Sequence, residues 1–532
     1  MYRLCIMLVI LTSVFAADDA WKQAYVPKGE AWKAAAQDFT FNNESEPETL
    51  DPAIMTGVLE GRLCLALFEG LVINDPKSLV PRPGCAESWE LSSDGLTYTF
   101  HLRDKLVWSD GSALTADDFV RSWRRVVTPK TAADYAYLMY HIVGAEAFHK
   151  GTSTDPASIG VSAPDTRTLV VKLVSPCPWF LDLCAFSTFQ PVPEGPIARH
   201  GEAWFRKELI GNGPFVLASW KPKQEIVLTK NPKYWDAGFV KLEKITAYPY
   251  DNMETAYKLY QDGKLHWLAQ IPLPKLDEVR RRADYYAAPY FGTYYYRLNT
   301  TKPPLDDVHV RRALAWAIDR KAIANEITRG GQIPAGSLCP AVAGYTPVVG
   351  PGLDIERARR ELAESAYGPG KKPLPPIELH FNTSEMHKSI AEAVAQQLKA
   401  ALGVEVVLRN VEWKTYLTEQ DKLEYVMSRS SWIGDYGDPD TFFTLFLGQG
   451  GNNKTGWKSA RYDALVTAAQ TEADPTRRWA IYHEAEKMLV DDECPIVCVY
   501  TYVAQGLLDE QVMGFEHNIR DLHPWQFVWL EK

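Results

Sequence analysis

The residue types that could bind a metal or catalyse a reaction occur without the spacing that such chemistry requires. His483-Glu484 begins like a zinc-protease helix, but position 487 is a lysine where a second histidine is needed. The segment DYGDPD, from Asp435 to Asp440, resembles a calcium loop but lacks its spacing and its closing glutamate. The GxxxxGK[ST], GxSxG and GxGxxG patterns are absent from the sequence. We therefore expect no catalytic residues, no metal site and no cofactor.

The cysteines do not describe a disulfide-stapled protein. Cys5 lies in an apolar N-terminal run, and the seven cysteines that remain of the 8 are an odd number in a long chain. The nearest pairs are Cys177 with Cys184 and Cys494 with Cys498, and either pair could be bonded in an oxidising compartment. Neither pair has the CxxC spacing of a zinc site.

Length and composition indicate a large globular protein. A chain of 532 residues exceeds one hydrophobic core, so two or three domains are expected. A net charge of −10 argues against a nucleic-acid partner, because phosphate binding needs a basic face. The 17 tryptophans and 26 tyrosines are amphipathic rings that can line a pocket, although large aromatic cores would account for many of them.

The N-terminus has the pattern of a secretory signal peptide. Arg3 precedes an apolar run from Leu4 to Leu11, and Val14 and Ala16 provide residues that a signal peptidase accepts. We expect cleavage near Ala16, so that residues 1–16 are removed on export. Because Cys5 lies inside the apolar run, a lipid anchor is not expected.

Alternating strand and helix patterns predict an α/β fold. Thr115 and Asp118 resemble a capping box at a helix start, Ser384 and Gly403 enclose an amphipathic helix, and Asp474-Pro475 begins another. The predicted strands are 97–103, 168–174, 225–230, 290–299, 404–410 and 496–504. Loops rich in proline and glycine are expected at 81–84, 191–196, 333–352 and 368–376.

Ten further blocks match one family in order and spacing. They are SEPETLDPA (45–53), LFEGLV (67–72), AESWELSSDGLTYTFHLRD (86–104), VWSDGSALTADDFVRSWRR (107–125), NGPFVL (212–217), NPKYWD (231–236), TYYYRLNTTKPPLDDVHVRRALAWAIDR (293–320), HFNTSEMHKSIAEAVAQQLK (380–399), VEWKTYL (411–417) and SWIGDYGDPDTFF (431–443). The chain resembles the extracellular solute-binding family 5, the dipeptide/oligopeptide/nickel receptors of ABC importers, and the oligopeptide-binding members above all. The resemblance extends from about residue 40 to the C-terminus.

The resemblance implies a two-lobed α/β periplasmic binding protein of type II, in its three-domain oligopeptide-binding variety, with hinge closure. Two crossing strands, near 290–296 and 500–505, would form the hinge. The implied parts are lobe I (17–60, 186–291 and 504–532), a satellite domain II (61–185) and lobe II (292–503).

The resemblance also implies ligand-binding residues. Asp435 matches the aspartate that pairs with a peptide ammonium, Arg429 and His387 match residues that meet carboxylates, and Glu46 lies in a segment that clamps the peptide backbone. Less specific matches are Trp413, Trp432, Ser431, Ile433, Tyr502 and Tyr295. Each has a structural alternative, as a turn aspartate, a solvated strand arginine, a capping histidine or a core aromatic residue.

Three positions depart from the family pattern. Arg121 stands where relatives commonly have tyrosine, and Gly292 and Ile433 stand where close relatives can have cysteines. The residues matched to the terminal charges of a peptide are present, so these departures bear on ligand length and sequence preference.

The implied function is that of a monomeric periplasmic receptor that binds short peptides and delivers them to a permease in the inner membrane. The alternative within the same fold is another solute, such as a murein peptide, a nickel chelate, haem or a sugar. A secreted hydrolase or a peptide-handling chaperone is the alternative from another class, but a hydrolase needs a nucleophile with its base or a metal.

Overall fold

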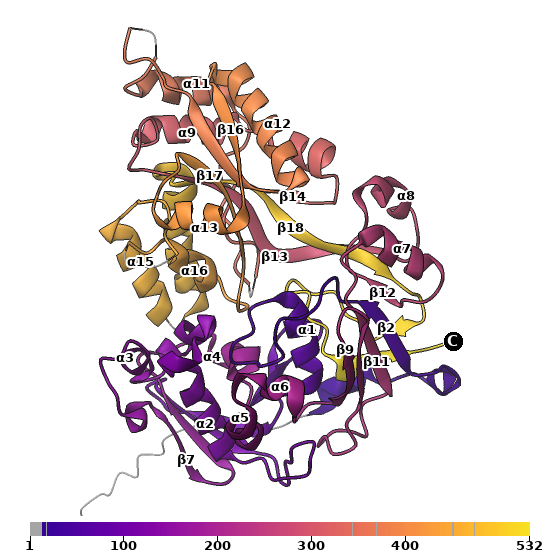
Figure 1. Cartoon of the computed structure of the whole chain (residues 1–532). Helices are drawn as coiled ribbons and strands as arrows, with labels where there is room; N and C mark the ends of the chain where they lie inside the picture. The colour runs from indigo at the N-terminus through magenta and orange to yellow at the C-terminus, as the bar shows by residue number, and fades with distance from the viewer. Residues whose placement is uncertain (1–12, 17–18, 343, 369, 449–451, 473) are drawn as a thin grey trace, which may run out of the picture. The chain divides into compact units, whose positions relative to one another are not determined.

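The computed structural model describes residues 13–16 and 19–532, apart from residues 343, 369, 449–451 and 473 (Figure 1). The chain forms two compact units. Unit 1 comprises the described residues up to Tyr286 together with 506–518 and 522–532, and unit 2 comprises 287–505 and 519–521. The chain passes between the units inside two strands, β13 (Tyr285–Leu298) and β18 (Ile496–Leu508). This mixed α/β architecture confirms the predicted fold class.

Unit 1 contains two main sheets. One has the strand order β18-β12-β2-β11-β10-β9, and its core includes Phe39, Phe41, Trp267 and Trp525. The other has the order β1-β5-β6-β8-β7. The strands of unit 1 are β1 (Ser13–Ala16), β2 (Asp38–Asn42), β3 (Val72–Asn74), β4 (Pro81–Pro83), β5 (Ala86–Leu91), β6 (Thr97–Leu102), β7 (Val161–Asp165), β8 (Thr168–Lys172), β9 (Phe215–Lys221), β10 (Glu225–Lys230), β11 (Lys244–Tyr248), β12 (Trp267–Leu268), β19 (Val512–Met513) and β20 (Trp529–Leu530).

The predicted capping box begins the long helix α2 of unit 1. The backbone N–H of Thr115 donates to Asp118 Oδ2 over 2.7 Å, and Phe119 and Trp123 of the helix are buried. The α-helices of this unit are α1 (Val58–Leu67), α2 (Ala116–Val126), α3 (Ala145–His149), α4 (Phe180–Ala185), α5 (Glu194–His200), α6 (Trp204–Lys207), α7 (Met253–Gln261) and α8 (Leu276–Val279).

Unit 2 is built on a sheet with the strand order β16-β15-β17-β13-β18. β15 is parallel to β16 and to β17, whereas β13 and β17 are antiparallel. The further strands and the helices of this unit are β14 (Ile333–Pro334), β15 (Ile377–Asn382), β16 (Val406–Val411), β17 (Met427–Ile433), α9 (Val308–Ala317), α10 (Arg320–Ala322), α11 (Ile355–Glu364), α12 (Glu385–Leu402), α13 (Trp413–Asp421), α14 (Asp440–Phe443), α15 (Ala460–Thr471) and α16 (Pro475–Lys487).

Two cores cover the two faces of this sheet. Tyr294 and Tyr296 of β13 pack with residues of α9, α11 and α12, whereas Tyr295 packs with residues of α14, α15 and α16. This division follows from the alternation of side chains along a strand. The two faces therefore offer different surroundings to neighbouring residues of the same strand.

Most of the predicted elements occur where the sequence placed them. Ser384 accepts a hydrogen bond from the backbone of His387 and begins α12, and Gly403 ends that helix with a φ of 70°. Asp474 accepts from Arg477 N and begins α16. Each of the six predicted strands is a strand of the structure, β6, β8, β10, β13, β16 and β18. These predictions are confirmed.

The division into units differs in detail from the predicted domains. Within β13 and β18 the chain passes between the units at 286/287 and 505/506, and it changes unit again at 518/519 and 521/522. The division does not separate 61–185 from the rest of unit 1. Ile519–Asp521, expected in lobe I, belong to unit 2, because Phe291 N donates to Ile519 O over 2.6 Å and Arg520 donates to Asp435 O over 2.8 Å. The satellite domain stays a prediction.

The cysteine pairs left open by the sequence are not bonded in the structure. Cys184, Cys494 and Cys498 are free, buried thiols. Burial raises the pKa of Cys494 to about 12, so its thiol stays protonated and unreactive at neutral pH.

Of the predicted signal peptide, the structure describes Ser13–Ala16. Residues 1–12, which include Arg3 and Cys5, lie outside the described residues, and Ser13–Ala16 pair with β5. In the described part of the chain, none of the helices combines the length and apolar character that a membrane crossing requires. The signal peptide stays a prediction.

Candidate ligand-binding site

The register of β13 and β17 gathers several of the predicted residues on one face of the unit 2 sheet. Tyr296 is opposite Arg429, Tyr294 is opposite Ser431, and Gly292 is opposite Ile433. Residues opposite each other in antiparallel strands share a face, and so do residues two apart in one strand. Arg429, Ser431 and Ile433 therefore lie in a row on the face that α12 covers at one end.

Arg429 is the charged centre of this face. Its side chain is buried, with 9% of its surface exposed, and its guanidinium lies 4.8 Å from the centre of the Tyr294 ring. Nη2 donates to the hydroxyl of Tyr502 over 3.0 Å, and Nη1 donates to Asn382 Oδ1 over 3.5 Å. Within the described residues Nε has no hydrogen-bond partner and no carboxylate pairs with the guanidinium. A buried positive charge with only neutral partners is unfavourable unless an anion reaches it.

His387 lies beside this charge, in the first turn of α12. Its ring centre is 5.6 Å from that of Tyr294, and its buried Nδ1 has no hydrogen-bond partner in the described part of the chain. Burial, together with repulsion from Arg429, lowers the pKa of His387 to about 3. The imidazole is therefore neutral at pH 7 and can act as a hydrogen-bond donor or acceptor without adding a charge.

Aromatic rings form the wall around Arg429. Tyr294 stacks on Tyr500 with 4.9 Å between the ring centres, and Tyr500 meets Tyr502 edge to face at 5.2 Å. Offset and edge-to-face packing stabilises such a cluster and leaves little conformational freedom. The Tyr502 hydroxyl is thus held in place for Arg429.

Gly292 and Ile433 are complementary in shape. A Cβ atom at position 292 would lie 2.2 Å from Ile433 Cδ1 and 3.3 Å from Tyr502 Cδ2. The isoleucine therefore occupies the space that a side chain at position 292 would need. The two departures from the family pattern at these positions compensate each other.

The loop that carries Asp435 is held by its two other aspartates. Asp438 forms a bidentate pair with Arg478, with both distances 2.6 Å. Asp440 accepts from the hydroxyls of Tyr436, over 2.8 Å, and Tyr482, over 2.9 Å. Buried carboxylates of this kind need such partners. Asp438 and Asp440 therefore have a structural role, which the sequence DYGDPD alone did not reveal.

Asp435 itself is fixed through its backbone. Its N–H donates to Thr441 Oγ1 over 3.2 Å, and its carbonyl accepts from Arg520 over 2.8 Å. The side chain is partly exposed. The main chain thus sets the position from which the carboxylate extends.

Two predicted residues are not part of this face. Trp432 and Tyr295 point to the opposite side of the sheet, where Trp432 Nε1 donates to Thr441 Oγ1 over 3.2 Å and Tyr295 packs fully buried near Phe446. Trp413 is the first residue of α13, and its side chain lies outside the described residues.

Glu46 belongs to unit 1, where its carboxylate already has donors. Trp220 Nε1 donates to Oε1, and the backbone N–H of Lys223 donates to Oε2 over 2.9 Å. These bonds fix the SEPET segment against the β9–β10 hairpin. The role of Glu46 as a clamp residue stays a prediction.

A cavity of about 920 Å³ in unit 2 lies elsewhere. It is lined by the proline- and glycine-rich segment around 333–353 together with Pro289, Phe291 and Thr501. None of the predicted site residues with a described side chain lines it. It is therefore separate from the surroundings of Arg429.

Sequence reasoning missed some partners of the site. Asn382 lies at the end of β15, in a block that carried the family resemblance. That block could have indicated Asn382 as a site residue, but its contact with Arg429 was not predicted. Arg520 contacts Asp435 across 85 residues of sequence, and nothing local to Arg520 indicates that contact. Tyr294 packs against the guanidinium of Arg429, and only the tertiary structure reveals this contact.

Comparison with known proteins identifies the family. The family model of bacterial extracellular solute-binding proteins, family 5 (middle), matches residues 80–454. The chain is 36% identical over 520 residues to the "Periplasmic oligopeptide-binding protein OppA" of Salmonella typhimurium, covering 95% of this chain and 94% of that one. It is 38% identical over 501 residues to the "Probable deoxycholate-binding periplasmic protein YgiS" of Escherichia coli, covering 92% of each.

A solved structure agrees over the same length. The unliganded open form of "MppA Periplasmic Murein Tripeptide Binding Protein" superposes with a TM-score of 0.80 at 35% identity, covering 93% of this chain and 98% of that one. The similarity covers more than 90% of this chain, so it does not depend on any single shared motif. This chain belongs to the bacterial extracellular solute-binding proteins, family 5.

Proposed function

We propose that this protein is the periplasmic receptor of an ABC importer, that it binds short peptides by their backbone and termini, and that it delivers them unchanged to a membrane permease. The oligopeptide- and murein-peptide-binding relatives support this ligand class. In this proposal the exported protein works as a monomer, without turnover.

The observation that carries the proposal is the buried Arg429 guanidinium without a carboxylate partner among the described residues. A peptide α-carboxylate supplies the missing charge, and a guanidinium binds a carboxylate with two parallel hydrogen bonds. Tyr502 orients the guanidinium, and neutral His387 offers Nδ1 as a further polar contact.

The other terminus of the peptide is assigned to Asp435. Its loop is rigid because Asp438 and Asp440 are fixed by Arg478, Tyr436 and Tyr482. A carboxylate held on a rigid loop loses little entropy when it pairs with an ammonium. This assignment follows the family match. Of the three aspartates in the loop, Asp435 is partly exposed, whereas Asp438 and Asp440 are buried.

Capture and release of the ligand would use, as a hinge, the two places where the chain passes between the units, in β13 and in β18. A ligand that makes contacts with both units only when they close shifts the population toward the closed form. The closed form is then the one that the permease recognises.

Calorimetry with a matched pair of peptides tests the carboxylate site. The protein is freed of ligand by unfolding and refolding, and a tripeptide is compared with its C-terminal amide. Loss of one partner of a buried charge pair costs ~2–5 kcal/mol, so the amide should bind the wild type at least about 30-fold more weakly. Arg429→Met should bind the acid and the amide equally. A wild type that binds both equally would sink the proposal.

An apolar carboxylate is the second candidate ligand. The relative described as a deoxycholate-binding protein favours it, because an aromatic wall with one buried cation also suits an amphipathic acid. Such a ligand depends on Arg429 but has no ammonium for Asp435. Asp435→Asn therefore separates the two: it weakens binding of a peptide and leaves binding of deoxycholate unchanged.

A further inference from the structure

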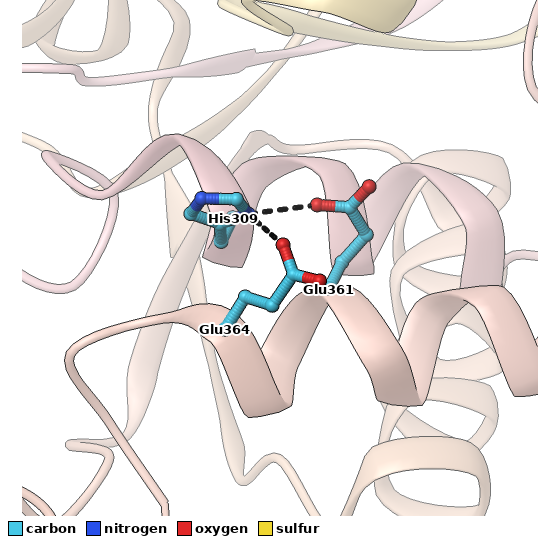
Figure 2. Close-up of side chains that lie close together, drawn as sticks. All are labelled: His309, Glu361 and Glu364. Atoms are coloured by element: carbon cyan, nitrogen blue, oxygen red, sulfur yellow. Dashed lines mark hydrogen bonds and ion pairs between the residues drawn. The ribbon is translucent and has the colours of Figure 1, made fainter.

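Three potential metal ligands converge on one side of unit 2, away from the residues assigned to peptide binding. Figure 2 shows the ring of His309, from α9, facing the carboxylates of Glu361 and Glu364, from α11. His309 Nδ1 lies 2.9 Å from Glu361 Oε2 and 3.6 Å from Glu364 Oε2. One ligand atom from each of the three residues lies within 4.8 Å of the others.

The helices present these side chains without strain. Glu361 and Glu364 are three residues apart, so they lie on the same face of α11. His309 follows the helix cap Asp307, whose carboxylate accepts from the backbone N–H of His309 over 2.9 Å. α9 and α11 share a core in which Ala358 packs with residues of α9. The distance between the ligands is therefore fixed by helix packing.

We propose that His309, Glu361 and Glu364 bind a divalent transition-metal ion, with Zn²⁺ the best match. In a tetrahedral zinc site the metal–ligand distances of about 2.0–2.1 Å place neighbouring ligand atoms roughly 3.3 Å apart. The two distances from His309 Nδ1 lie on either side of this value. Three protein ligands leave the fourth position to water, the arrangement of an open zinc site.

The chemistry of the three ligands selects among metals. Imidazole nitrogen is a good ligand for Zn²⁺, Cu²⁺ and Ni²⁺, whereas Mg²⁺ and Ca²⁺ prefer oxygen alone. Glu364 is 67% exposed, which gives an ion access, and Glu361 is 16% exposed, which limits competition from water.

One neighbouring cation opposes the ion and limits the affinity. Arg312 Nη1 lies 3.8 Å from Glu361 Oε2. Its guanidinium is also held by the backbone carbonyl of Asp492, to which Nε donates over 2.9 Å. Two carboxylates and one guanidinium leave one net negative charge for the metal. The bound ion would link α9 to α11 and stabilise unit 2.

Zinc titration of the full-length chain without a histidine tag, stripped of metal with a chelator, tests the site. The wild type should bind one Zn²⁺ at this position, and its melting temperature should rise with zinc. His309→Gln and Glu364→Gln should each lower the affinity at least about 10-fold and remove the rise. Because Glu364 is mostly exposed, its substitution is compatible with folding.

His483→Gln is the matched control, because His483 lies outside the cluster: its Nε2 is 2.6 Å from the carbonyl oxygen of Thr346, and its ring packs against Tyr345. It should bind zinc like the wild type. Co²⁺ provides a second readout, since the wild type should give visible absorption bands of a tetrahedral site that are lost in His309→Gln. No zinc binding by the wild type, binding that survives both cluster substitutions, or an equal loss in His483→Gln would overturn the proposal.

Discussion

At the scale of single residues, two buried arginines of unit 2 differ in their partners. Arg478 forms a bidentate pair with Asp438, whereas Arg429 has aromatic, hydroxyl and amide partners but no carboxylate in the described part of the chain. Burying a charge without a counter-ion is costly. Protein stability explains the first arginine, and ligand binding is the role that we propose for the second.

The difference predicts opposite effects on stability. Arg429→Met should leave the free energy of unfolding of the ligand-free protein unchanged or raise it, because it removes an uncompensated charge. Arg478→Met should lower it by ~3–5 kcal/mol, because it leaves Asp438 buried and unpaired. Urea unfolding of both variants measures this. An equal loss in the two variants would contradict a ligand-binding role for Arg429.

At the scale of elements, α16 organises the proline- and glycine-rich segment around 333–353. Glu486 of this helix is fully buried and accepts hydrogen bonds from the backbone of Leu338, Cys339 and Val348 and from the hydroxyl of Tyr345. Burial raises the pKa of Glu486, while these donors favour the ionised form. One side chain thus orders a loop that has little regular structure.

Glu486→Gln should therefore destabilise the protein by ~1–3 kcal/mol. The amide NH₂ of glutamine cannot accept a hydrogen bond, and all four groups that bond to Glu486 are donors. At least one of these donors would therefore lose its acceptor. Glu484→Gln on the same helix is the control, since Glu484 is 49% exposed and pairs with the exposed Arg461, so its loss should cost ~0–1 kcal/mol. Thermal unfolding compares the two. Equal melting temperatures would show that the loop does not depend on Glu486.

At the scale of the whole molecule, each unit contains a histidine that folding keeps neutral. Burial lowers the pKa of His141 in unit 1 to about 4, and burial and Arg429 lower that of His387 in unit 2 to about 3. The unfolded chain has ordinary imidazoles with a pKa near 6.5. Below pH 6.5 the unfolded state therefore binds more protons than the folded state.

The contribution of these two groups to stability should thus be constant above pH 6.5 and fall as the pH drops below about 6.5, down to about pH 4 for His141 and about pH 3 for His387. Each imidazole contributes at most about 1.4 kcal/mol per pH unit, and less where water reaches the ring. Unfolding measured from pH 7.5 to 4.5 should show a weaker pH dependence in His141→Gln and in His387→Gln. A slope that neither substitution changes would contradict this account.

The sequence by itself determined the elements and the family. Thr115 and Asp118, Ser384, and Asp474-Pro475 begin helices because caps satisfy backbone groups within a few residues, so the signal is local. The match of Arg429 to a family arginine likewise came from the sequence, whereas its place in β17 came from the structure. Ligand-binding roles for Arg429, His387 and Asp435 stay predictions.

Tertiary structure alone decided which carboxylates and rings face which partners. Asp438 has a structural role because Arg478, 40 residues away in sequence, pairs with it. Tyr295 points away from the face of Arg429 because side chains alternate along a strand and Tyr294 points toward that face. His309 contacts Glu361, which is 52 residues away in sequence. The sequence contains each residue but not these distances, because helix packing and strand register fix which distant side chains share a face.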